Sequence, residues 1–310
     1  MSEPSRGILY VASGAKFRDE ALVSARSIKT AWPDVQLAII TDQPVDTGIF
    51  DTVRIVPLQG DNIDKVRYIS QTPFERTILL DTDTYCLGAF PELFDLLDRF
   101  QLAAALDIGR FSESWDVSAG ANVFIRANGV SECFTELNTG VIAFRSDPDV
   151  MQVFDQWLNA CLGARQAATP HGQDQPSFRK VIYDSDIRIA TLPSEYCFRV
   201  HTPDYARGAV KILHGRWSYS DLGAEPDAVF ARLGRLLNKT LGPRVLVHAF
   251  GIISGHGPYC IPLREQHGEE RELIYKESPP RRFGRLRKFL RWLLSSHRGA
   301  QYAEHPDKFA

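Results

Sequence analysis

The stretch Thr77-Ile-Leu-Leu-Asp-Thr-Asp-Thr-Tyr85 decides the fold of this chain, because strand-like apolar residues run directly into two aspartates one residue apart. A strand that ends in this way delivers both carboxylates to the carboxyl edge of a sheet, where open α/β folds bind their ligands. Two hard oxygen ligands on one turn suit Mg²⁺ or Mn²⁺. The alternative interpretation is that the aspartates only cap a helix that begins near Phe90-Pro91.

The sequence before this stretch predicts a parallel sheet. Gly7 to Ala12 and Gln36 to Asp42 have the apolar runs of buried strands, and the apolar spacing between them predicts a helix over Arg18 to Trp32. A third strand is predicted over Thr52 to Pro57. Strand, helix and strand within about forty residues require a right-handed crossover, and therefore parallel pairing.

The rest of the chain continues the α/β pattern. Strands are predicted over 101–107, 138–145, 187–192 and 209–213, and helices over 91–100 and 148–161. Residues 109–129 show no clear period and are interpreted as a long loop that can cover a site. No glycine-rich phosphate loop follows the first strand, which argues against a dinucleotide dehydrogenase or a P-loop nucleotidase.

Composition indicates a globular protein of the cell interior. The 310 residues are 44% hydrophobic, which is enough for a large core, and we expect one α/β domain over 1–260 with an extension over 261–310. The five scattered cysteines form no Cys-x-x-Cys pair, as is typical of reduced thiols in the cytoplasm. The sequence contains neither a signal peptide nor an apolar run of the roughly 18 residues that a membrane span needs.

The extension has a basic segment. Seven Lys and Arg residues and no acid occur between positions 281 and 298, although the formal net charge of the chain is −2. The remainder is therefore acidic and unsuited to nucleic acid. Over 281–294 apolar residues recur at helical spacing, and such a basic amphipathic helix suits an anionic membrane surface, here the inner face of a membrane. The alternative is a helix that packs on its own domain or on a partner.

Five motifs occur together in an order that resembles the GT-A glycosyltransferases, and within them glycosyltransferase family 8. They are Tyr10 to Ser13, Thr72 to Asp83, Asn138-Thr-Gly140, Asp174-Gln175 and Ile212-Leu-His-Gly215. The resemblance implies a Rossmann-like GT-A fold with a mostly parallel sheet flanked by helices. It also implies transfer of a sugar from a nucleoside-diphosphate donor, usually a uridine diphosphate sugar, to a hydroxyl of a glycan or lipid-linked acceptor.

A metal site is part of this resemblance. Asp81 and Asp83 would hold Mn²⁺ or Mg²⁺ against both phosphates of the donor, and His214 would complete the protein ligands. The cation stabilises the charge that develops on the leaving nucleoside diphosphate. His248, which also follows a strand-like run, is the next candidate. A structural role for His214 is the alternative.

Further positions resemble the residues that bind the donor. These positions are Tyr10, Ala12, Asp42, Arg67 and Thr82, with Lys65 as the competitor of Arg67 for the diphosphate. Tyr10 and Ala12 would bracket the base and ribose, and Asp42 would reach the nucleoside. As alternatives, the first two need be no more than core strand residues, Asp42 can cap a turn, and Arg67 can be an exposed helix charge.

Asn138, Asp174 and Gln175 resemble the residues that line the sugar and the reaction centre. In retaining members of the group, Asp174 or Gln175 is the candidate nucleophile by position. Front-face attack assisted by the departing phosphate is the competing account, and the sequence leaves the choice between retention and inversion open. Asp174 can also be the N-cap of a helix that begins near Pro176.

Two other classes of function fit parts of the sequence. Leu-Leu-Asp-Thr-Asp-Thr matches the nucleophile motif of haloacid dehalogenase-like phosphohydrolases, although that motif normally follows the opening strand. A non-catalytic glycan-binding protein on a GT-A scaffold is the second alternative. One departure from the family pattern is the segment Gly215-Arg-Trp217, which lacks the usual lysine-proline-tryptophan after the histidine.

Overall fold

The structure is a computed structural model, and it describes residues 4–45, 48–107, 129–131, 133–166, 174–200, 204–215, 226–239, 241–248 and 259–262. Among these residues, no helix has both the length and the apolar character needed to cross a membrane. The predicted loop over 109–129, except its last residue, and the predicted basic helix over 281–294 lie outside the described residues.

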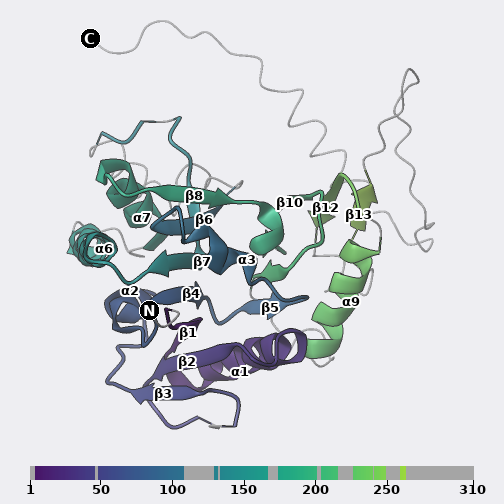
Figure 1. Cartoon of the computed structure of the whole chain (residues 1–310), viewed down its shortest axis with the longest axis horizontal. Coiled ribbons are helices and arrows are strands. Elements are labelled where there is room, and N and C mark those ends of the chain that lie inside the picture. Colours follow the sequence, from purple (N-terminus) through teal and green to yellow (C-terminus); the bar gives the residue numbers. More distant parts are fainter. Residues whose placement is uncertain are drawn as a thin grey trace, which may run out of the picture. The chain divides into compact units, whose positions relative to one another are not determined.

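A seven-stranded sheet forms the centre of the fold (Figure 1). Its strands, in spatial order, are β3 (Thr52–Ile55), β2 (Gln36–Thr41), β1 (Arg6–Ala12), β4 (Arg76–Leu80), β7 (Leu137–Arg145), β6 (Leu102–Leu106) and β8 (Ile189–Leu192). β7 runs antiparallel to both of its neighbours, and every other pair in this sheet is parallel. The predicted α/β class with a mostly parallel sheet is therefore confirmed.

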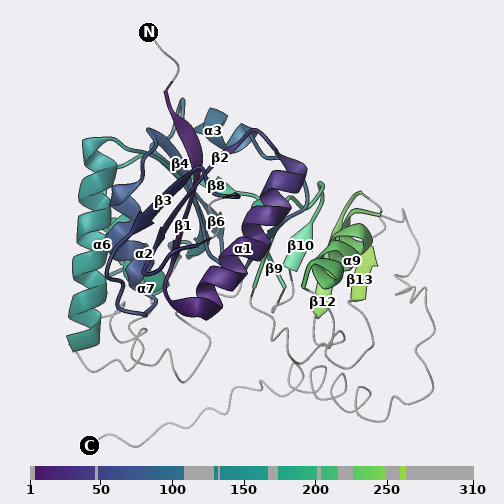
Figure 2. The same ribbon diagram turned by 90° about the horizontal axis from the view of Figure 1, so that it is seen from below.

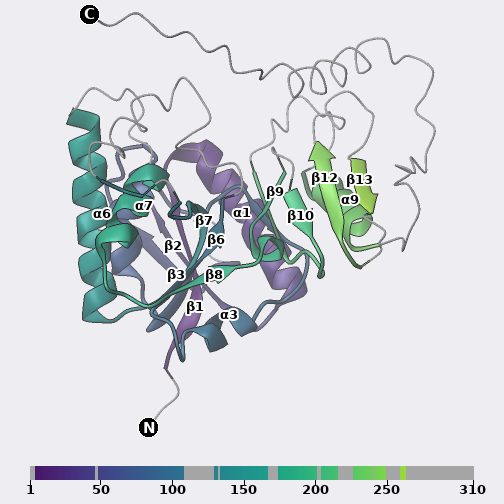
Figure 3. The same cartoon turned by 90° about the horizontal axis from the view of Figure 1, so that it is seen from above.

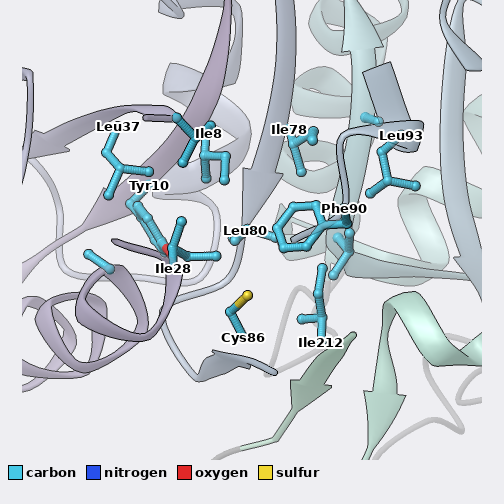
Figure 4. Packing of buried hydrophobic residues seen from close by; sticks show 14 of the residues in the cluster. Ile8, Tyr10, Ile28, Leu37, Ile78, Leu80, Cys86, Phe90, Leu93 and Ile212 are labelled. Atoms are coloured by element: carbon cyan, nitrogen blue, oxygen red, sulfur yellow. The ribbon is translucent and has the colours of Figure 1, made fainter. Parts of the chain in front are cut away.

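Helices cover both faces of this sheet, as Figures 2 and 3 show. The first core contains side chains of α1 (Gly14–Ala31) and α3 (Glu92–Leu96), and the second contains those of α2 (Asp64–Tyr68), α6 (Pro148–Gln166) and α7 (Asp174–Asp184). Successive side chains of β1 point to opposite faces of the sheet, so Ile8 and Tyr10 pack in the first core and Leu9 packs in the second. Figure 4 shows Tyr10 in the first core beside Ile28 and Leu37.

Two smaller sheets complete the described fold. One consists of β5 (Thr84–Cys86), β11 (Ile212–His214) and β9 (Phe198–Arg199), and the other of β10 (Asp204–Ala206), β12 (Arg244–His248) and β13 (Tyr259–Pro262). The remaining elements are α9 (Pro226–Asn238) and the 3-10 helices η1 (Ile69–Gln71) and η3 (Ser194–Tyr196). β5 begins directly after the acidic turn, and its antiparallel partner β11 therefore ends next to that turn.

Some element boundaries differ from the predicted ones. α1 begins at Gly14, before the predicted start at Arg18, because Ala15 and Lys16 are exposed and its first turn gives no apolar period. The helix predicted over Pro91 to Phe100 is reduced to the five residues of α3. His214 is the last residue of β11, whereas the sequence placed it just after a strand.

Candidate metal centre

Asp81 and Asp83 lie on the turn between β4 and β5, and His214 faces them from β11. The Nε2 atom of His214 is 3.5 Å from Oδ2 of Asp81 and 3.4 Å from Oδ1 of Asp83. One ligand atom from each of the three residues lies within 4.8 Å of the other two. Two carboxylates and one imidazole that converge on one point form a donor set that fits a divalent cation such as Mn²⁺ or Mg²⁺.

Strand pairing and two glycines bring His214 to this point. In the β5–β11 pair, His214 lies opposite Thr84, one residue after Asp83. Gly215 then has φ 144°, which favours glycine, and its N–H donates to the Asp83 carbonyl at 3.1 Å. Gly140 of β7 lies directly against the imidazole, because a Cβ added there would be 2.2 Å from Cε1 of His214. A larger residue at position 140 would therefore displace the ring.

Lys65 of α2 is bound between two carboxylates of the site. Its Nζ atom is 2.8 Å from Oδ1 of Asp81 and 2.8 Å from Oδ2 of Asp174, and it donates to Oγ1 of Thr139 at 3.1 Å. Burial alone would lower the pKa of Lys65, but Asp174 and Asp81 raise it above its ordinary value. The ammonium is therefore charged, and it contacts both carboxylate oxygens of Asp81, of which Oδ2 also faces His214.

The same charges set the protonation of Asp81 and His214. Burial would raise the pKa of Asp81, yet Lys65 and His214 hold it below its usual value. Burial would lower the pKa of His214, yet its contacts with Cys197, Asp83 and Asp81 raise it well above the usual value. Sγ of Cys197 lies 3.3 Å from Nδ1, the ring nitrogen that does not face the aspartates.

Arg67, which was predicted to lie near the donor diphosphate, pairs with two aspartates outside the Asp81–Asp83–His214 cluster. Its Nη1 atom is 3.0 Å from Asp61 and 3.0 Å from the buried Asp64. Lys65, its competitor, is the cation that contacts Asp81. Residues two apart on a helix do not face the same way, so only one of the two cations can face the acidic cluster. Lys65, and not Arg67, is therefore the candidate for the basic residue near the diphosphate.

A buried polar network lies beside the cluster. Nδ2 of Asn138 donates to Asp107 at 3.0 Å and to Gln175 at 3.2 Å. Nε2 of Gln175 donates to Asp107 at 3.1 Å and to Glu136 at 2.6 Å. Arg199 donates to the same oxygen of Asp107 at 2.8 Å. These contacts orient both amide groups, which the sequence had assigned to the reaction centre.

Asp174, which precedes Gln175 of this network in the chain, pairs with Lys65. Its Oδ2 atom accepts a hydrogen bond of 2.6 Å from Thr139, and its carbonyl accepts one of 2.7 Å from the indole of Trp157. Asp174 is the first residue of α7, as expected for an acidic residue at a helix start. The structure thus brings Asn138, Asp174 and Gln175 together, and leaves their chemical roles as a proposal.

The other predicted donor positions are occupied by contacts within the protein. The side chains of Tyr10 and Ala12 are 0% and 1% exposed, so neither has surface to offer a base or ribose. Thr82 donates to Glu20 at 2.9 Å. Asp42 accepts from the Gly14 N–H at 3.0 Å and pairs with Arg18 at 3.0 Å.

Several residues around the site were not found from sequence. They are Asp107, Glu136, Thr139, Cys197 and Arg199. Two of them could have been found, since Asp107 ends a predicted strand as Asp81 does and Thr139 lies within the motif Asn138-Thr-Gly140. Glu136, Cys197 and Arg199 belong to no motif. His248, the alternative metal ligand, ends β12, which belongs to a different small sheet from β11.

Fold and site together define a class: the described chain has the GT-A fold of glycosyltransferases, with a candidate Asp-Asp-His metal site. The solved structure of the galactosyltransferase LgtC, in complex with donor and acceptor sugar analogues, matches with a TM-score of 0.50 and 14% identity over 76% of this chain and 96% of that chain. At this identity the likeness shows the fold alone.

Two further solved structures are similar at lower scores. The apo bifunctional glycosyltransferase WbbM has a TM-score of 0.49 and 15% identity over 65% of this chain and 41% of that chain. Apo mouse xyloside xylosyltransferase 1 has a TM-score of 0.47 and 14% identity over 69% of this chain and 98% of that chain. No family model matches the sequence, and no curated protein matches it.

Proposed function

We propose that this protein is a metal-dependent glycosyltransferase that moves a sugar from a nucleoside-diphosphate donor, expected to be a uridine diphosphate sugar, to an acceptor hydroxyl. The convergence of Asp81, Asp83 and His214 is the observation that carries the proposal. The proposed acceptor is a glycan or a lipid-linked glycan. LgtC, which shares the fold, was solved with donor and acceptor sugar analogues.

The three converging residues would hold Mn²⁺ or Mg²⁺, which supplies charge stabilisation to a departing nucleoside diphosphate. Lys65 keeps the Asp81 carboxylate ionised and oriented, because its ammonium lies 2.8 Å from Oδ1 and 3.1 Å from Oδ2 of that carboxylate. Its ammonium also places a fixed positive charge next to the proposed phosphate position. Together these residues favour anionic groups over neutral sugars at this end of the site.

The sugar would lie toward Asn138 and Gln175. Bond breaking occurs between the anomeric carbon and the phosphate oxygen, and the acceptor oxygen forms the new bond to that carbon. Asp174 is held by Lys65 and Thr139, and both amide groups of the network are held by Asp107 or each other. These contacts favour the front-face course, in which the departing phosphate takes the proton of the acceptor hydroxyl, over attack by Asp174 or Gln175.

A donor-cleavage assay tests this proposal. The protein is incubated with Mn²⁺ and a panel of nucleotide sugars, and released nucleoside diphosphate is measured. We expect release with one donor and its loss in Asp83→Asn, while Asp51→Asn, which alters a surface pair with Lys29, retains it. Turnover of p-nitrophenyl phosphate without donor cleavage would favour a phosphohydrolase, and glycan binding without any turnover would favour a non-catalytic protein.

A further inference from the structure

The turn that carries Asp81 and Asp83 is attached to α1 through a buried row of polar side chains. Glu20, Ser24 and Ser27 are four and three positions apart, so they lie on one face of α1. All three are buried, with exposed fractions of 3%, 0% and 5%. A polar face inside a core destabilises the fold unless it is hydrogen-bonded. The hydrogen-bond partners of this polar face of α1 therefore indicate its structural role.

Each of these residues bonds the segment that follows β4. Glu20 accepts from Thr82 at 2.9 Å, the hydroxyls of Ser24 and Thr84 are 2.8 Å apart, and Ser27 accepts from the Cys86 N–H at 2.9 Å. The even-numbered residues of this segment thus face α1. The aspartates at the odd positions 81 and 83 face His214 instead.

The number of hydroxyl hydrogens available determines which residue donates in each of three consecutive hydrogen bonds of this row. The Thr84 hydroxyl donates to the Asp81 carbonyl at 2.8 Å, which uses its single hydrogen. Ser24 must then donate to Thr84, and Tyr10, whose oxygen is 2.8 Å from that of Ser24, must donate to Ser24. Burial raises the pKa of Tyr10, so Tyr10, the first donor in this series of hydrogen bonds, keeps its proton.

We propose that Tyr10, Ser24 and Thr84 are positioning residues that fix the backbone of Asp81 and thereby direct its carboxylate at the cation. The Asp81 carbonyl accepts both the hydroxyl and, at 3.3 Å, the N–H of Thr84. A fixed carbonyl fixes the direction of the Cα–Cβ bond, and outer partners of this kind tune metal affinity. This inference rests on the proposed metal site, and it gives Tyr10 a role that needs no contact with substrate.

A pair of threonine-to-valine variants tests the inference. Thr84→Val keeps the side-chain shape and removes the hydroxyl. Thr77→Val is the matched control, because Thr77 is also fully buried and its hydroxyl bonds Thr72 at 2.7 Å. We expect similar losses in melting temperature from both variants, but about tenfold weaker Mn²⁺ binding by calorimetry in Thr84→Val alone. Thr84→Ser, which restores the hydroxyl, should bind Mn²⁺ as the wild type does.

A second measurement on the metal-free protein separates this inference from the metal site itself. The amide at position 84, which donates to the Asp81 carbonyl, should exchange its hydrogen faster in Thr84→Val than in Thr77→Val. Equal Mn²⁺ affinities or equal exchange rates in the two valine variants would overturn the positioning role. Failure of the wild type to bind Mn²⁺ would instead overturn the metal site, and the positioning role with it.

Discussion

Lys65 is the residue on which the charge balance of the site depends, since it binds Asp81 and Asp174 together. Lys65→Gln should leave these two carboxylates without their shared cation and so misplace Asp81. We expect donor cleavage to fall about 10²-fold, as when one stabilising donor is removed from an active site. The measurement is the rate of nucleoside diphosphate release under saturating Mn²⁺.

Arg67→Gln is the control for this prediction, because Arg67 occupies the same short helix and also binds two aspartates. Its partners Asp61 and Asp64 lie outside the metal cluster. We expect a lower melting temperature with donor cleavage largely retained. Equal losses of activity in the two variants would return the phosphate role to Arg67.

Gly140 sets the space in which the His214 ring lies. A methyl group at this position would meet Cε1 at 2.2 Å and Nε2 at 2.6 Å, far inside contact distance. Gly140→Ala should therefore move the imidazole and weaken Mn²⁺ binding by at least about tenfold, as measured by calorimetry.

Gly163→Ala in α6 is the matched control, because nothing lies within 4 Å of the added methyl group. Alanine in a helix interior is favoured over glycine by about 0.5–1 kcal/mol, so this variant should be equally or more stable and bind Mn²⁺ normally. Normal Mn²⁺ binding in Gly140→Ala would show that His214 is not a ligand.

At the scale of elements, the sequence could predict where a strand ends better than which side chains of an element face the site. The apolar run before Asp81 was sufficient to place the acidic turn at a sheet edge. Tyr10 is fully buried, which fits its alternative interpretation as a core strand residue. β1 is buried on both faces, and an unbroken apolar run does not show which of its side chains pack in which layer. Arg67 was predicted ahead of Lys65 as the basic residue near the diphosphate, but the packing of α2 decides which side chain points at β4, and that side chain is Lys65.

Long-range pairing was the other missing information. The motif predicted His214, but its meeting with Asp81 and Asp83 depends on the β5–β11 pairing across more than a hundred residues of sequence. The reversed direction of β7, which places Gly140 and Thr139 at the site, also has no local signal. Short motifs can therefore list candidate ligands, whereas the geometry comes from the sheet order.

The β9–β10 region provides a pH prediction. Asp204 is buried and accepts hydrogen bonds from the N–H groups of Arg199 and Tyr205, and burial raises its pKa to about 6. A folded-state pKa above the unfolded value of 3.8 means that the folded protein binds this proton more tightly. The stabilisation from protonation is complete below the unfolded value and is lost as the pH rises through the folded value.

Denaturant unfolding from pH 4 to pH 7 measures this effect. Relative to Asp204→Asn, which has no titrating group at this position, the wild type should lose about 1.4 kcal/mol per pH unit within the window. The difference should be constant above the folded-state pKa. Parallel stability curves across the whole range would mean that Asp204 titrates normally.

At the scale of the whole chain, the basic segment 281–294 is proposed to bind an anionic membrane surface. Sedimentation with vesicles of anionic lipid compares the full chain with a form that lacks residues 281–310. We expect the full chain to pellet with the vesicles, less so as salt is raised, and the shortened form to remain in solution. Equal pelleting of the two forms would contradict membrane binding by this segment and favour the alternative, a helix that packs on its own domain or on a partner.

Metal binding should stabilise the chain as a whole, because the proposed ligands come from two sheets. Asp81 follows a strand of the central sheet, and His214 belongs to the small sheet of β11. A ligand that binds only the folded state stabilises it by about 2.7 kcal/mol at one hundred times its dissociation constant. Mn²⁺ should therefore raise the melting temperature of the wild type, a chelator should reverse the rise, and Asp83→Asn should show little of it. A rise of equal size in Asp83→Asn would place the bound ion elsewhere, since removal of one of three ligands cannot leave the same site intact.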